Sequence, residues 1–143
     1  MIRAIRSIHF LSACLALCWS VTVQAQTPSA ADTRLYFISP ADGETVHSPL
    51  TVRFGLQGMG VAPAGVERDK TGHHHLLIDV DQLPALHAPV PSDANHRHFG
   101  GGQTEIMLEL KPGEHSLQLL LGDHMHIPHN PPVLSQRIRF KVD

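Results

Sequence analysis

Histidine side chains gather in three short stretches of this sequence, and each stretch holds two histidines separated by one residue. On an extended backbone, alternate side chains point to the same side about 6.5–7 Å apart, so one cation can contact both rings. Neutral imidazole is a ligand for zinc, copper, iron and nickel. The candidates for a transition-metal site are the three pairs and one histidine that follows them: His73, His75, His96, His98, His124, His126 and His129.

Two other interpretations account for the paired histidines. They can form a hydrogen-bonded polar cluster that shapes loops, or a pH-responsive surface for a partner, because imidazole titrates near physiological pH. A ligating imidazole usually donates its other N–H to a carboxylate or carbonyl. The acids that could accept such a bond are Asp79, Glu105 and Asp123, although Asp123 after Gly122 also suits a turn. The Gly100-Gly101-Gly102 run would let the backbone approach the cluster closely.

The remaining histidines have simpler interpretations. His74 shares an apolar face with Leu76 and Ile78, so we expect a hydrogen-bonded, partly buried histidine there rather than a ligand. Three others stand alone in turns or at a strand start and are expected to have no functional role: His47, His87 and His115.

No catalytic residue can be assigned from the sequence. His96, His98 and Glu105 compare poorly in spacing with the metal ligands of cupin enzymes. The sequence has no Ser-His-Asp order and no Gly-x-Ser-x-Gly elbow, and no Gly-Lys-Ser/Thr follows the glycine run as a phosphate loop requires. Binding is therefore preferred over catalysis, and a catalytic metal site with an open position stays the other option.

Residues 1–25 are predicted to be a signal peptide. Arg3 and Arg6 precede an apolar run from Ile8 to Val23, and Val23-Gln24-Ala25 provides a small-residue cleavage site. The competing interpretations are a transmembrane anchor and a lipid anchor at Cys14. Cleavage after Ala25 predicts a periplasmic or secreted protein with no membrane span.

Cleavage would leave Gln26 to Asp143, which is the length of one domain. Cys14 and Cys18 would both be lost, which excludes disulfides and thiolate ligands. The mature chain carries nine Lys and Arg against thirteen Asp and Glu, with no basic cluster, so nucleic acid is not an implied partner. The partner implied by the histidines is a metal ion, with another envelope protein as the alternative.

Short apolar runs between Pro and Gly turns predict an all-β domain over residues 35–142, preceded by a flexible leader at residues 26–34. Six or seven strands without a helix favour an antiparallel, immunoglobulin-like β-sandwich. Lys111-Pro112-Gly113-Glu114 predicts a hairpin between two of the strands, and residues 82–102 predict a long loop. The strands are expected at residues 35–39, 49–56, 73–81, 104–110, 115–121 and 134–142.

Four blocks of this sequence, "GHHHLLID", "HFGGGQTE", "PGEHSLQLLLGDH" and "IPHNPPVLS", resemble the signature blocks of a functionally uncharacterised family of exported bacterial domains. The resemblance covers Leu35 to Val142 and implies one domain, while leaving the chemistry to be argued. Many relatives are expected to have Asn at the position of Met125, so the methionine sulfur does not support a copper site. "ISPADGETVHSPLTVRF" also resembles the first strands of bacterial immunoglobulin-like modules, including periplasmic copper carriers.

These patterns predict a histidine-rich site at one end of a β-sandwich that binds copper or zinc for storage, trafficking or sensing. Calcium and magnesium would require oxygen ligands instead. The alternative is a cell-envelope interaction module whose histidines are structural. The sequence leaves open which ion binds, whether the histidine groups form one site or several, and the oligomeric state.

Overall fold

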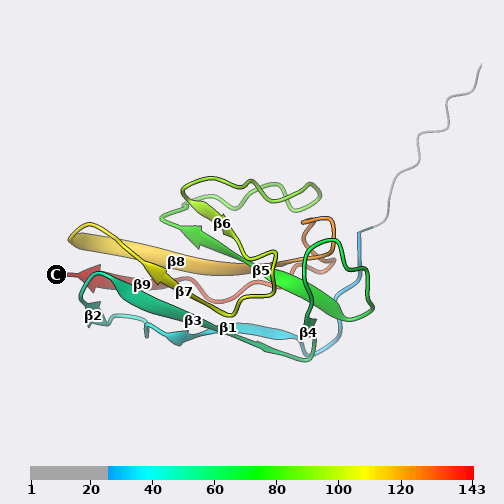
Figure 1. Ribbon diagram of the computed structural model, residues 1–143, viewed down its shortest axis with the longest axis horizontal. Coiled ribbons are helices and arrows are strands. Elements are labelled where there is room, and N and C mark those ends of the chain that lie inside the picture. The colour runs from blue at the N-terminus through cyan, green and yellow to red at the C-terminus, as the bar shows by residue number, and fades with distance from the viewer. Residues whose placement is uncertain (1–25) are drawn as a thin grey trace, which may run out of the picture.

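The computed structural model describes residues 26–143, and all of its regular elements are β-strands. The predicted signal peptide and both cysteines lie outside the described residues. In the described part of the chain, no helix could span a bilayer. The strands form two sheets that pack face to face, which confirms the predicted all-β sandwich (Figure 1).

The smaller sheet has three antiparallel strands in the order β1-β3-β7. These are β1 (Arg34–Ser39), β3 (Leu50–Gln57) and β7 (Glu105–Leu108). Strand β3 alternates as its sequence predicts, with Leu50, Val52 and Phe54 buried. One face of this sheet therefore lines the core.

The larger sheet has six strands, and β5 lies inside it with partners on both edges. Strand β8 pairs with one edge of β5, while β4 and β6 pair with the other. The β2–β9 and β4–β5 pairings are parallel and two residues long, and the remaining pairings are antiparallel. The strands are β2 (Thr45–Val46), β4 (Gly60–Val61), β5 (Thr71–Ile78), β6 (His96–His98), β8 (Gly113–Gly122) and β9 (Ile138–Val142).

Leucine, valine and phenylalanine side chains from both sheets fill the space between them. Every second residue of β8 points into this core, beginning at Leu117 and ending at Leu121, and the side chains between them point to the other face. Full burial of such a side chain contributes about 1.5–3 kcal/mol to stability. The fully buried apolar members of this core are Val52, Leu76, Leu117, Leu119, Leu121, Phe140 and Val142.

The predicted hairpin at residues 111–114 is wrong. Strand β7 pairs with β3 in the smaller sheet, whereas β8 lies between β5 and β9 in the larger one, so this link crosses from one sheet to the other. Pro112 and Gly113, whose φ is 139°, allow the chain to reverse, but they do not determine which sheet receives the next strand.

Several strand boundaries differ from the sequence-based expectation, among them the end of β5 at Ile78 instead of residue 81, and two of the differences follow from long-range pairing. Residues 96–98 lie in the predicted long loop, yet they form β6 against β5. Strand β9 begins at Ile138, four residues later than predicted, and Leu134 makes only an isolated bridge to Leu120. In both cases the pairing depends on where β5 and β8 lie in space, which the local sequence does not encode.

Strand β5 is buried on both of its faces. His74, Leu76 and Ile78 point toward the smaller sheet, as their alternation predicts, and His73, His75 and Leu77 point to the opposite face. Segments following β5 and β8 lie over this outer face (Figure 1). Leu77, Leu120 and Val90 are buried without belonging to the main core group.

His74 is an ionisable residue in the apolar core. It has no exposed surface, and its ring packs against Phe54 with centroids 5.2 Å apart. Among the described residues, neither ring nitrogen has a hydrogen-bond partner of ordinary geometry, which differs from the predicted hydrogen-bonded state. Burial lowers the pKa of His74 to about 4, and the nearby Gln103 backbone opposes this shift only in part.

His74 should therefore make folding less favourable in acid. The unfolded chain takes up a proton at this position below about pH 6.5, whereas the folded chain does not until about pH 4, so stability is lost as the pH falls between these values. The His74→Leu variant removes this contribution. Urea unfolding at pH 7.5 and pH 5 should show the variant gaining about 2 kcal/mol on the wild type at the lower pH. Parallel stability profiles would contradict the assignment.

Candidate metal centre

Four of the seven candidate histidines converge in the structure. One ring nitrogen from each of His73, His75, His98 and His126 lies within 4.8 Å of the other three. The centroids of these four rings are separated by 4.5 to 6.0 Å. We call this group the four-histidine cluster.

Two paired strands position three members of the cluster. His73 and His75 are alternate residues of β5, so both rings lie on its outer face. In the antiparallel register of β5 and β6, His98 lies directly opposite His75. The two rings stack, with centroids 5.2 Å apart and planes 28° apart. The pleat of the sheet therefore sets these three positions.

The fourth member, His126, comes from a turn that follows β8. The His126 amide donates to the Asp123 carbonyl at 2.9 Å. The Oδ1 atom of Asp123 accepts from the amides of Met125 and Ile127, at 2.9 and 3.0 Å. His126 has a φ of 66°, which is uncommon outside glycine and brings the chain back toward β5. Asp123 therefore stabilises a turn, which is one of the two roles that its sequence context suggested.

The turn is also held from outside by two other segments. Thr27 Oγ1 donates to Asp123 Oδ2 at 2.8 Å, and the Thr27 carbonyl accepts from the Asn130 amide at 3.0 Å. From another direction, the Val90 amide donates to the His126 carbonyl at 2.9 Å. The start of the predicted flexible leader, residues 26–29, is thus docked against this turn because its polar groups find partners there.

Two glycines make room for the imidazole rings. A Cβ atom at Gly122 would lie 2.6 Å from Cε1 of His75, and one at Gly100 would lie 2.4 Å from Cε1 of His98. Both distances are far below van der Waals contact. Gly100 therefore has the close-approach role expected of the glycine run, and Gly122 has a similar role that its sequence context did not single out.

The two members of the cluster that come from β5 stay neutral over most of the pH range in which proteins are stable. Burial, reinforced by neighbouring histidines, lowers the pKa of His73 to about 4 and that of His75 to about 3. Burial and the nearby His126 also lower the pKa of His98. Neutral imidazole is the form that binds metal, because a protonated ring has no free lone pair.

Hydrogen bonding satisfies the cluster only in part. His73 Nε2 and His126 Nδ1 lie 3.1 Å apart, which permits one bond if one of the two nitrogens carries a proton. The Nδ1 atoms of His73 and His75 are buried and have no partner among the described residues. Each buried polar group without a partner costs about 1–3 kcal/mol.

Three of the predicted ligands lie outside the cluster. The antiparallel register places His96 beside Leu77, two residues beyond His75, and its Nδ1 lies 2.9 Å from Asp93 Oδ1. His129 is fully buried, with Nε2 3.2 Å from the Thr71 carbonyl. His124 is in the same turn as His126, where the backbone is not extended and the alternation of a strand does not apply.

The acidic residues considered as outer partners have other contacts. Asp79 Oδ2 lies 2.8 Å from His115 Nδ1, and Glu105 pairs with Arg53 at 3.1 Å. Asp123 organises the His126 turn. The negative charge of Asp123 opposes the lowering of the His73 pKa, but burial has the larger effect and the pKa is lowered overall.

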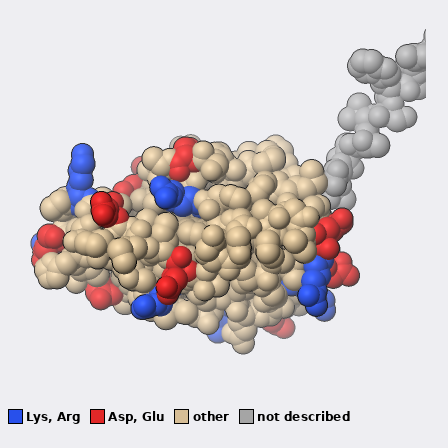
Figure 2. Space-filling model, in the orientation of Figure 1, with Lys and Arg blue, Asp and Glu red and all other residues tan. Residues whose placement is uncertain are grey.

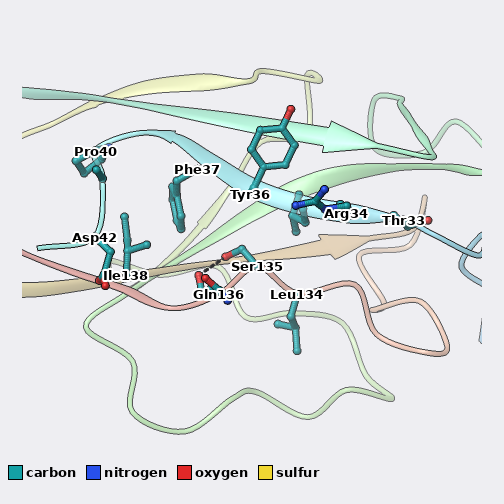
Figure 3. A pocket seen from close by; sticks show the side chains of 12 residues that line it. Thr33, Arg34, Tyr36, Phe37, Pro40, Asp42, Leu134, Ser135, Gln136 and Ile138 are labelled. Carbon is teal, nitrogen blue, oxygen red and sulfur yellow. Dashed lines mark hydrogen bonds between the residues drawn. The ribbon is translucent and has the colours of Figure 1, made fainter.

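A different part of the surface has a hollow of about 510 Å³, between β1 and residues 134–138 (Figure 3). It contains no histidine, and its serine, Ser135, already bonds the Leu119 amide and the Gln136 carbonyl. Charged residues of both signs are scattered over the face shown in Figure 2. Neither feature offers chemistry comparable to that of the cluster.

The fold and the cluster define a β-sandwich domain with four convergent histidines on the outer face of its larger sheet. The chain belongs to the family described as Domain of unknown function (DUF4399), whose family model matches residues 52–143. The matched region contains all four histidines. No curated protein and no solved structure matches the chain. This match confirms the expectation that the chain belongs to a functionally uncharacterised family.

Because Gly122 lies against His75, its replacement should disturb the cluster. We expect Gly122→Ala to lower the free energy of unfolding by about 1–3 kcal/mol, as overpacking does in a buried site. Gly60→Ala is the matched control, since a Cβ there would make ordinary contact with Thr71 at 3.5 Å. Chemical denaturation measures both variants. Equal effects of the two substitutions would show that Gly122 has no special steric role.

Proposed function

We propose that this domain binds a transition-metal ion, copper or zinc, through the four-histidine cluster. The observation that carries the proposal is the convergence of His73, His75, His98 and His126 around one point, with ring nitrogens within 4.8 Å of each other. The cellular role that we propose is storage, trafficking or sensing of the ion. The predicted signal peptide supports a periplasmic location.

The size of the cluster suits one ion. Metal–nitrogen bonds of about 2.0–2.1 Å in a tetrahedral site hold the nitrogens about 3.3 Å apart. His73 Nε2 and His126 Nδ1 are already 3.1 Å apart, and the ligand atoms of all four residues, which lie within 4.8 Å of one another, would close to a similar separation around an ion. A bound cation would also replace the single hydrogen bond between these two rings with two metal–nitrogen bonds.

A purely structural role accounts less well for the same geometry. Histidines that order loops by hydrogen bonding should have their nitrogens paired. Within the cluster only His73 and His126 form such a contact, and two buried Nδ1 atoms have no partner among the described residues. Burial also keeps His73 and His75 neutral, which suits a ligand, and these two rings contribute no charge to a surface for a partner.

Four protein ligands favour binding over catalysis. Catalytic zinc sites usually have three protein ligands and keep one position for water or substrate, whereas closed sites use four. The cluster nevertheless has a route to solvent, because His98 is exposed and His126 is half-buried. An ion can therefore enter and leave from the side of these two residues, as storage or trafficking requires.

The purified domain, prepared without a His-tag, should bind one zinc or copper ion in isothermal titration. His75→Ala and His126→Ala should each weaken binding by at least about tenfold, because each removes a ligand. Free metal at roughly 100 times the dissociation constant should raise stability by about 2.7 kcal/mol. Proton competition at His73 and His75 should weaken binding mainly as the pH falls toward about 4, because burial holds the pKa values of these two imidazoles at about 4 and about 3.

His96→Ala and His115→Ala are the matched controls, because their rings are engaged with Asp93 and Asp79 instead of the cluster. Both variants should bind metal like the wild type. Dissociation constants weaker than about 0.1 mM, a value that ordinary surface histidines can reach, would refute the proposed function. So would affinity that falls equally in the control variants.

A further inference from the structure

We infer that the four-histidine cluster is a tetrahedral site that holds zinc(II) in preference to copper(II). This inference rests on the proposed function and adds the identity of the ion. Geometry distinguishes the two ions, because copper(II) with nitrogen ligands prefers a square-planar or tetragonal arrangement, whereas zinc(II) has no such preference and is usually tetrahedral.

The six distances between the ring centroids exclude a planar arrangement of the rings. Four rings around a square-planar ion would have their centroids near the corners of a square. In a square, each of the two diagonals is about 1.4 times as long as a side. Here five of the distances lie between 4.5 and 5.2 Å, and only the His75 to His126 distance, 6.0 Å, is longer. The other diagonal of such a square, His73 to His98, is only 4.9 Å.

Nearly equal distances are what a tetrahedral ion requires. With bonds of about 2.0–2.1 Å, four imidazoles in a tetrahedron have their centroids about 5.2 Å apart. The observed distances scatter around this value. The four ring centroids therefore already lie near the corners of a tetrahedron. No ring has to change its position relative to the other three for tetrahedral coordination.

The scaffold resists a change to planar geometry. His73 and His75 are fully buried on β5, and the backbone of His98 is fixed opposite His75 by strand pairing. His126 is set by the Asp123 turn and by the bond from the Val90 amide. Flattening the cluster would have to displace at least one of these segments, so copper(II) would be bound in a geometry that it disfavours.

The chemistry of the ligands agrees with zinc. The cluster is made of four imidazoles, which are borderline ligands that suit zinc(II). The mature chain that the sequence predicts has no cysteine to supply a thiolate, one of the soft ligands that select copper(I), and the four members of the cluster are all imidazoles. Flexible histidine peptides bind copper(II) more tightly than zinc(II), in the order expected for divalent ions, and a rigid tetrahedral site reduces that advantage.

Cobalt(II) substitution tests the geometry directly. Cobalt(II) in a four-coordinate tetrahedral site has intense visible d–d bands, whereas six-coordinate cobalt(II) is nearly colourless. We expect intense bands for the wild type and for His96→Ala. In His75→Ala the bands should shift in position and need more cobalt to develop, because water would have to supply the fourth ligand. Zinc should displace the cobalt stoichiometrically. Faint bands in the wild type would overturn the tetrahedral assignment.

Competition titrations test the preference. We expect the ratio of copper(II) affinity to zinc(II) affinity to be at least about tenfold smaller for the domain than for a flexible hexahistidine peptide. An equal or larger ratio, with a tetragonal copper(II) electron paramagnetic resonance spectrum, would overturn the inference while leaving metal binding intact. Failure of zinc, copper and cobalt to bind would instead refute the proposed function, so the two failures are distinguishable.

Discussion

The burial of β5 on both faces is the constraint on which the rest of the structure depends. One face completes the core between the sheets, and the other lies beneath the segments that follow β5 and β8. A strand in this position needs a nearly continuous buried run, and the triple histidine followed by Leu76, Leu77 and Ile78 supplies it. Three imidazoles are thereby removed from water, and their chemistry follows from that burial.

Burial of the imidazoles has a cost and a consequence. Buried rings that stay neutral make the domain less stable in acid, and those without hydrogen-bond partners add a desolvation cost at every pH. In the cluster, the same burial holds the rings of His73 and His75 with their centroids 4.8 Å apart, and the Nδ1 atom of each has no partner among the described residues. An ion that bound there would offset part of the cost, because binding to the folded state alone adds to its stability. Metal binding and folding are coupled in this way in other small domains.

Strand β5 directs its three histidines to two different environments. Adjacent residues on a strand point to opposite faces, so His74 enters the apolar core against Phe54 while its neighbours join the cluster. His126 lacks the support of a strand and depends instead on Asp123 and on the docked Thr27. The position of His126 therefore depends on contacts between three separate segments of the chain, because the Val90 amide also donates to its carbonyl.

The sequence by itself determined the all-β class, the faces of β3 and β5, and the three histidine groups as the chemical feature of the chain. These follow from period-two alternation and from residue type, which are local properties. Only the tertiary structure decided which histidines meet. The register of β6 against β5 brings His98 to His75 and takes His96 away, and the turn at Asp123 selects His126 over His124. Strand pairing and turn geometry act between residues far apart in the chain, so the spacing of the histidines alone could not identify the four that converge.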